Sequence, residues 1–416
     1  MKKIVLLVVF TLLFVIGFNL KYKTKIFEKR LGVEKTSAEV DELYIYGRKL
    51  NMKGSIELGF TSFKDIKLVL YNNDFTYYDL KYHKSGKNID FWISEEINNG
   101  VLLDNIKRGN YYMFIEISTE VNGELEKKYY PLINKTEYRE TKYFTISKQN
   151  NKITILNEES YPTMKMIVEE NKEKDIYDIV IDPGHGGDDP GTTFSNYYES
   201  EINLNNALKL KKALEGIGLR VILTRDKDVN VDAYGTGSRT SIPHEVCAKY
   251  LISLHVNSTD GVMDYGGVEV YAPNNSNLRF ASSLAKNIVE SANTNYSYKQ
   301  SFRSDKGVYV RTFTSSDINE SISEAREYGF SPYHITTDTN YYFVIRETGG
   351  YMTGAYIDGR YKYYAKNDYY NSNVGIEGYI LELGYINYSE DLNNLTNNSE
   401  GYITGIVNAF REELNM

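Results

Sequence analysis

The chain has 416 residues, a formal net charge of −8 at pH 7 and a single cysteine, Cys247. This length exceeds what one hydrophobic core usually supports, so we expect at least two domains. The acidic balance excludes a general nucleic-acid binder, and a lone cysteine excludes both an intrachain disulfide framework and a cysteine-rich zinc ribbon. A metal site in this chain would have to use histidine and carboxylate ligands.

The N-terminal segment, residues 1–25, places an apolar run from Ile4 to Phe18 behind two lysines. This pattern is typical of a signal peptide or a membrane anchor rather than of a buried soluble helix. Neither a small-residue cleavage motif nor a lipobox cysteine follows, which favours an uncleaved anchor. We therefore expect the rest of the chain to lie outside the cytoplasm, either anchored to the membrane or secreted.

Residues 38–156 alternate short apolar and aromatic runs with polar turns, as in LYIYG, IKLVLYNN, YYMFIEIS and KITIL. This spacing predicts a small all-β, sandwich-like accessory domain. The range contains no cluster of histidine and acidic residues of catalytic type. Residues 157–176 are charged and weakly patterned, which favours a linker or a connecting helix.

From residue 177 to 416, strand, loop and helix patterns alternate. YDIVID, LRVILT, LISLH and GVEVYA are typical of strands, while INLNNALKLKKALEGIG, HEVCAKY and NLRFASSLAKNIVESA are typical of helices. This alternation predicts an α/β domain with a mostly parallel, twisted sheet flanked by helices. In such folds, the side chains of a site gather where strands end.

Candidate site residues stand near three strand ends. His185 follows IVID within the glycine-rich loop DPGHGGDDPG, His255 closes LISLH, and Glu382 lies within GYILELGYIN. Two histidines and one carboxylate form a recurrent zinc set that leaves a position open for water. From the residues alone, the carboxylate ligand is either Glu199 or Glu201 at the start of the first long helix.

Five motifs together carry a resemblance: IDPGHGGDDPG, YYESEINLNNALKL, ILTRD, ISLHVN and ILELGYINYSED. In order and spacing they resemble the zinc-dependent N-acetylmuramoyl-L-alanine amidases of peptidoglycan, of the amidase-3 type, over about residues 178–300 and 375–412. The resemblance implies that His185, Glu199 and His255 hold one Zn²⁺ ion. It also implies that Glu382 is the catalytic carboxylate.

Several details of the sequence bear on this resemblance. Glu199 is favoured over Glu201 because it stands eight residues before Ala207, as the family's ligand does before its helix alanine. Arg239 precedes His255 by sixteen residues, like the family's arginine, whereas His244 departs from the family pattern and is expected to pack or to lie at the surface.

An insertion at about residues 312–374 is longer than a minimal family core needs. It contains His334 and Glu347, which we expect to be loop polar residues rather than site residues. Asp182 and Asn257 are close enough in sequence to the two histidines to orient them, and a purely structural role is equally compatible with their positions.

The function implied by the resemblance is hydrolysis of the amide bond between N-acetylmuramic acid and L-alanine, with Glu382 moving the proton of a zinc-activated water. The expected partners are peptidoglycan, the membrane through the N-terminal segment, and a protein activator of unknown identity, but no nucleic acid. One alternative is another zinc hydrolase acting on wall peptide or sugar, although the helical H-E-x-x-H signature is absent. The other alternative is a non-catalytic wall-binding protein with an amidase fold. The presence of all four site residues argues against this alternative.

Overall fold

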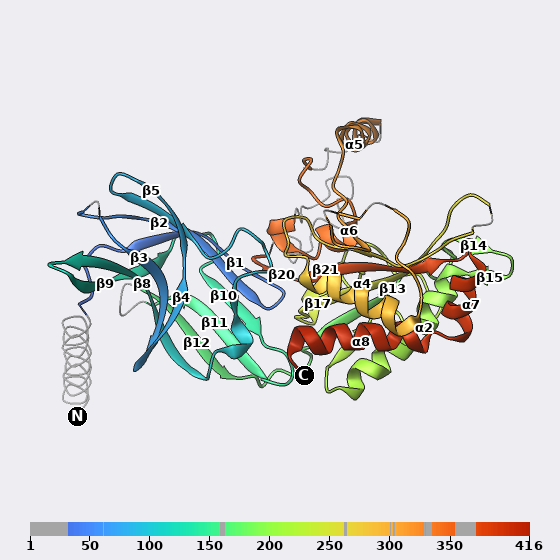
Figure 1. The fold of residues 1–416 in the computed structure, drawn as a ribbon, viewed down its shortest axis with the longest axis horizontal. Coiled ribbons are helices and arrows are strands. Elements are labelled where there is room, and N and C mark those ends of the chain that lie inside the picture. Colours follow the sequence, from blue (N-terminus) through green and yellow to red (C-terminus); the bar gives the residue numbers. More distant parts are fainter. Residues whose placement is uncertain are drawn as a thin grey trace, which may run out of the picture.

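The computed structural model describes residues 32–60, 62–158, 163–261, 264–299, 301–302, 304–327, 329, 335–353 and 372–416 (Figure 1). The predicted signal or anchor segment, residues 1–25, and His334 lie outside the described residues. Among the helices of the described ranges, none combines the length and the apolar character that spanning a membrane requires.

The first part of the chain forms a β-rich region. In the described residues, strands β1 to β12 join β20 in a thirteen-stranded sheet with the main path β10-β11-β12-β8-β9-β1-β2-β6-β5. Its pairs are antiparallel except where β1 meets β9 and β20. The bounds are β1 (Ala38–Tyr46), β2 (Lys49–Glu57), β3 (Asp65–Asn72), β4 (Asp74–Asp79), β5 (Lys81–Ser85), β6 (Asn88–Trp92), β7 (Val101–Leu102), β8 (Gly109–Val121), β9 (Glu124–Asn134), β10 (Glu140–Phe144), β11 (Asn151–Asn157), β12 (Met164–Glu170) and β20 (Val374–Gly375), with the short helix η1 (Leu103–Asn105).

Both ends of this path contribute to one hydrophobic core. Leu50 and Phe91 come from one end, and Ile115 and Ile155 come from the other, and all four are buried. The predicted alternation of apolar and polar residues over 38–156 therefore corresponds to strands that mostly present one face to this core, whereas β5 is exposed along its whole length. Whether the region is an independent domain stays a prediction.

The linker predicted over residues 157–176 is wrong, because strand β12 lies within this range. It pairs with β11 on one side and β8 on the other. Met164, Met166 and Val168 are buried at every second position, which is the period of a strand with one face in a core. The charged residues that favoured a linker include Glu169 and Glu170, which are exposed at the end of the strand.

The second part of the chain is an α/β region whose six-stranded sheet has the order β16-β13-β17-β21-β18-β19. All neighbouring pairs are parallel except β18 with β21, so the predicted α/β fold is confirmed with a mixed sheet. The bounds are β13 (Ile179–Pro183), β14 (Thr193–Phe194), β15 (Tyr197–Tyr198), α2 (Glu199–Gly216), β16 (Val221–Leu223), α3 (Ile242–Glu245), β17 (Tyr250–Asn257), β18 (Glu269–Tyr271), α4 (Arg279–Ala292), β19 (Val308–Tyr309), α5 (Ser315–Glu327), α6 (Phe343–Arg346), η2 (Gly350–Thr353), β21 (Glu377–Tyr385), α7 (Ser389–Asn397) and α8 (Glu400–Leu414).

Helices cover both faces of this sheet. Helices α2, α4 and α8 lie together on one face, where Leu210, Leu284 and Ile406 join the larger core (Figure 1). On the other face, α6 packs through Val344 and Ile345 in a smaller core. The helix predicted from HEVCAKY is only the four-residue α3, which ends at Glu245.

The β-rich and α/β regions touch through hydrogen bonds as well as apolar contacts. The end of the insertion forms β20, which pairs with β1. The Nδ2 of Asn98 donates to Oε1 of Glu377 at 2.7 Å, and Nη1 of Arg48 donates to the carbonyl of Glu413 at 3.1 Å. The backbone N–H of Ser147 donates to Asp178 at 2.9 Å. This interface lies where β21 begins, away from the carboxyl ends of the parallel strands.

Candidate active site

The glycine-rich loop after β13 brings its backbone unusually close to two side chains. A Cβ at Gly184 would lie 2.3 Å from Cε1 of His255, and a Cβ at Gly191 would lie 2.6 Å from Oε2 of Glu199. His185, between them, has a φ of 61°, in the left-handed region that non-glycine residues seldom adopt. The loop therefore has a specific shape that places the His185 imidazole beside His255 and Glu199.

Two arginines donate hydrogen bonds to backbone carbonyls of this loop. Arg239 donates to the carbonyl of His185 at 2.6 Å, and Arg225 donates to the carbonyl of Gly184 at 3.0 Å. Arg239 is itself paired with Asp182, at 2.5 Å. Because buried carbonyls need donors, these guanidinium groups satisfy a backbone that belongs to no regular element.

The carboxylate of Asp182 is bound by groups other than the two imidazoles. It accepts hydrogen bonds from Arg239, Thr224 and Ser253. Burial alone would raise the pKa of Asp182, but the Arg239 charge and these hydrogen bonds lower it. Asp182 thus remains ionised and holds Arg239, so its position fits the structural alternative rather than direct orientation of a histidine.

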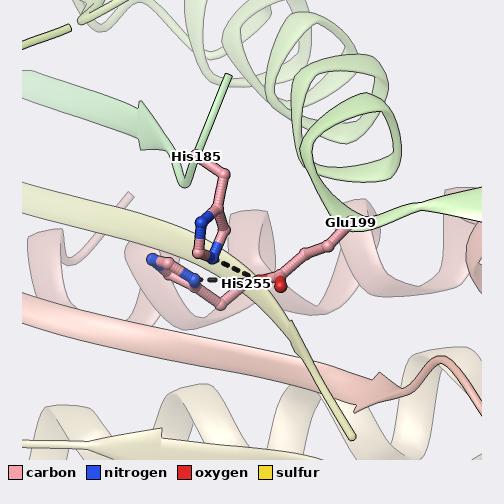
Figure 2. Close-up of side chains that lie close together, drawn as sticks. All are labelled: His185, Glu199 and His255. Carbon is pink, nitrogen blue, oxygen red and sulfur yellow. Dashed lines mark hydrogen bonds and ion pairs between the residues drawn. The ribbon is translucent and has the colours of Figure 1, made fainter. Parts of the chain in front are cut away.

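His185, Glu199 and His255 converge at the carboxyl end of the sheet (Figure 2). His185 comes from the loop after β13, Glu199 begins α2, and His255 lies near the end of β17. Oε1 of Glu199 lies 3.2 Å from Nε2 of His185 and 3.0 Å from Nδ1 of His255. One potential ligand atom from each residue lies within 4.8 Å of the others. Glu201, the alternative carboxylate, is exposed on α2.

The charges of this trio stabilise one another. Burial would raise the pKa of Glu199, yet hydrogen bonds from His185 and His255 hold it well below its usual value. Burial would lower the pKa of His185, but Glu199 and Asp189 raise it to about 9. Glu199 is therefore ionised, and its negative charge between the two imidazoles favours the binding of a cation there.

Asp189 is a contact that sequence reasoning missed. Its Oδ2 lies 2.8 Å from Nδ1 of His185, so it fixes the orientation of that ring while Nε2 faces Glu199. A carboxylate on the second nitrogen of a metal-binding histidine is a common supporting arrangement. Its place four residues after His185 in DPGHGGDDPG was the signal available in the sequence.

Glu382 lies directly beside this trio on the neighbouring strand, where it is the register partner of His255. Its Oε2 is buried and has no hydrogen-bond partner in the described residues. Burial raises the pKa of Glu382 to about 7, and nearby Glu199 and Glu269 also raise it, whereas the charge of His255 lowers it. A carboxylate with a pKa near neutrality and a free buried oxygen is suited to accept a proton from a substrate or water.

A cavity of about 530 Å³ opens over these residues. His185, His255 and Glu382 line it, and so do Tyr342 and Phe343 of the insertion. The insertion therefore contributes to the cavity through aromatic side chains. Neither the insertion as a site component nor these two residues were predicted from the sequence.

Other residues considered from the sequence lie elsewhere. Glu347 is fully buried behind α6, where its Oε1 pairs with Nε of Arg346 at 2.8 Å. His244 is buried in α3, and burial lowers its pKa to about 4, as expected of a packing residue. The side-chain oxygen of Asn257 accepts a hydrogen bond from the backbone N–H of Ser258 at 2.9 Å, so it is engaged with its own loop.

The donor set fits a zinc ion. Two imidazoles and one ionised carboxylate match the preferences of Zn²⁺, and one ligand atom from each lies within 4.8 Å of the others. Glu382 lines the same cavity as the two histidines, so its carboxylate stands beside the proposed metal position.

Comparison with known proteins gives the following matches. A family model described as N-acetylmuramoyl-L-alanine amidase matches residues 179–411. A sporulation-specific N-acetylmuramoyl-L-alanine amidase of Bacillus subtilis (strain 168) is 38% identical over 87 residues, which are 20% of this chain and 32% of that protein. A probable N-acetylmuramoyl-L-alanine amidase of Haemophilus influenzae is 37% identical over 100 residues, 23% of this chain and 22% of that protein.

The chain thus spans between about a fifth and a third of the length of these curated relatives. Among solved structures, the catalytic domain of CwlV, an N-acetylmuramoyl-L-alanine amidase from Bacillus (Paenibacillus) polymyxa var. colistinus, is 20% identical and has a TM-score of 0.38. That match covers 58% of this chain and 99% of the other. The family match confirms the resemblance that the motifs predict.

Proposed function

Since this chain belongs to the N-acetylmuramoyl-L-alanine amidase family, we propose that it hydrolyses the amide bond between N-acetylmuramic acid and L-alanine in peptidoglycan with the help of zinc. The observation that carries this proposal is that His185, Glu199 and His255 converge beside Glu382, whose side chain lines the same cavity as the two histidines. Such a set supplies metal ligands and a proton acceptor at the same place.

The proposed ligands are His185, Glu199 and His255, with Asp189 fixing the ring of His185. The chemistry that zinc supplies when bound is Lewis acidity toward the scissile carbonyl and the attacking water. Glu382 accepts the proton of that water and returns it to the nitrogen of L-alanine as the C–N bond breaks. Proton transfer by a positioned carboxylate contributes typically about 10²–10⁴-fold to the rate.

The test is hydrolysis of purified peptidoglycan by the full chain, with added zinc and with a chelator. We expect new α-amino groups on L-alanine in the presence of zinc and none with the chelator. New reducing sugar ends, or new amines on other residues, would identify a different wall hydrolase instead. Binding to the wall without any new ends would identify a non-catalytic wall-binding protein.

The cellular setting is part of the same proposal. Peptidoglycan amidases act in the extracytoplasmic cell wall, and residues 1–25 are proposed to deliver this chain there and to anchor it in the membrane. The β-rich region is proposed to be an accessory domain that positions the enzyme on the wall or on an activating protein. It carries no metal-ligand cluster in its described residues, which supports a positioning role.

A further inference from the structure

A second groove lies against the catalytic cavity, between helices α5 and α6 of the insertion. Its volume is about 330 Å³. Tyr342 and Phe343 line both the groove and the catalytic cavity, so a molecule in one adjoins the other.

Aromatic rings form the floor of this groove. The ring of Tyr341 lies 5.2 Å from that of Phe313 and 5.6 Å from that of Tyr342, measured between centroids. Tyr342 is held in turn by the ring of Tyr271 on β18, at 4.9 Å. The floor is therefore supported by the sheet, and it offers apolar ring surface to an aliphatic chain.

The wall that α5 contributes is acidic. Glu320 and Glu324 stand one helical turn apart, are exposed, and line the groove. Arg346, which also lines the groove, is buried against Glu347 and donates to the carbonyl of Tyr341. Arg311 stacks over the ring of Tyr341 at 3.6 Å. The groove thus presents apolar rings below and carboxylates at the side.

We propose that this groove binds the stem peptide on the leaving side of the scissile amide, with the side-chain amine of its diamino acid at Glu320 and Glu324. This inference rests on the proposed function, in which L-alanine and the residues after it form the leaving group. A diamino acid has an aliphatic stem and a terminal ammonium group, which match the aromatic floor and the acidic wall in that order. The insertion would then select substrates by the charge of the third stem residue.

The experiment compares two soluble substrates that differ by one charge. They are N-acetylmuramoyl-L-Ala-γ-D-Glu-L-Lys and the same compound with its lysine Nε acetylated. For the zinc-loaded full chain, we expect a kcat/KM about fivefold to tenfold higher for the free amine, the size of a partly desolvated charge pair. In the Glu320→Gln, Glu324→Gln double variant, the two substrates should be cleaved at equal rates.

The matched control is Glu327→Gln, which removes a carboxylate from the same helix outside the groove. It should keep the preference for the free amine. Equal kcat/KM for both substrates in the unmodified chain, or an undiminished preference in the double variant, would overturn the inference.

A second measurement separates this inference from the proposed function. Absence of hydrolysis of either substrate would refute the proposed function and leave the groove to be judged by binding alone. Calorimetric titration with the sugar-free tripeptide L-Ala-γ-D-Glu-L-Lys measures that binding without cleavage. Binding that weakens on acetylation of the amine, and that weakens equally in the double variant, supports the groove. An affinity that is the same for the free and the acetylated tripeptide refutes the inference.

Discussion

His185 is the residue on which the candidate centre depends most strongly for its shape. Its left-handed backbone, its carbonyl bound by Arg239 and its ring bound by Asp189 all constrain where the imidazole lies. Strain of this kind persists only where the surroundings enforce it, and it is frequent at functional sites. The single loop thus sets one of the three proposed ligands.

Replacement of His185 or of His255 by alanine tests the metal assignment. Removing one of three protein ligands leaves too few donors to compete with water, so each variant should lose most of its bound zinc. Elemental analysis of the purified, folded proteins measures this loss. His83→Ala is the control, because His83 is exposed on β5. Zinc at the level of the unmodified chain in both site variants would disprove the assignment.

Glu382→Gln tests the proton-transfer role. The change preserves size and one carbonyl oxygen but removes basicity, so zinc content should stay constant while turnover falls by roughly two or more orders of magnitude. Zinc analysis and peptidoglycan hydrolysis are measured on the same sample. Glu201→Gln serves as the control, since Glu201 is exposed on α2. Loss of zinc in Glu382→Gln would make Glu382 a ligand rather than a base.

At the level of elements, β21 carries functional groups at both ends. Its carboxyl half presents Glu382 to the cavity, whereas its first residue, Glu377, is buried at the contact with the β-rich region. Burial raises the pKa of Glu377 to about 7, Glu413 adds to the rise, and hydrogen bonds from Tyr379 and Asn98 oppose it. The start of this strand is therefore sensitive to pH.

The sign of that sensitivity follows from linkage. The pKa of Glu377 is higher in the folded protein than in the unfolded chain, so its contribution to stability is fully present below about pH 4. It is lost as the pH rises through about 7. A shift of this size corresponds to at most about 3 kcal/mol. The folded protein should therefore lose stability between pH 5 and pH 8 through this residue.

Glu377→Gln should remove this part of the pH dependence, because the amide keeps an acceptor oxygen and does not titrate. Urea unfolding at pH 5 and at pH 8 gives the free energy of unfolding for both proteins. The variant should lose less stability than the unmodified chain over this range. Glu57→Gln, at an exposed position of β2, is the control. An identical loss in Glu377→Gln and the unmodified chain would contradict the assignment.

For the whole molecule, the interface between the regions is built from buried polar contacts. Arg48 and Asp104 pair at 2.5 Å within the β-rich region, and Arg48 also reaches Glu413 of α8. Asn98 meets Glu377, and β20 pairs with β1. Separating the regions would leave several of these groups without partners, at a cost typical of buried polar atoms.

We therefore predict that the two regions unfold in one transition. Trp92, the single tryptophan of the chain, lies in β6 and reports on the β-rich region by fluorescence. All α-helices of the described residues lie in the second part of the chain, so circular dichroism at 222 nm reports on the α/β region. The urea midpoints of the two signals should coincide. Midpoints that differ by more than about 0.5 M would show two independently unfolding domains.

Some features of the fold were predictable because they depend on local pattern. The long helix α4 shows an apolar period close to that of a helix, and the buried strands are continuous apolar runs. The helix predicted from HEVCAKY is too long, because the observed helix ends at Glu245. Strand β12 was missed because the charged residues at its exposed end outweighed the alternation of Met164, Met166 and Val168. Short segments carry too few residues for the period to decide.

By itself, the sequence determined the α/β alternation, the family motifs and the candidates His185, Glu199, His255 and Glu382. These features rest on residue type, spacing and the position of a residue at a strand end, all of which are local. The roles of the four residues stay predictions. Their proximity was inferable because parallel strands bring their carboxyl ends to one edge.

Only the tertiary structure decided how the distant parts meet. It placed Tyr342 and Phe343 of the insertion on the wall of the catalytic cavity, set Glu377 against Asn98, and paired β20 with β1. Each of these contacts joins segments whose own sequences carry no signal of the partner. They are selected by the packing of the complete chain, in which a buried polar group must find a partner and an apolar surface must be covered.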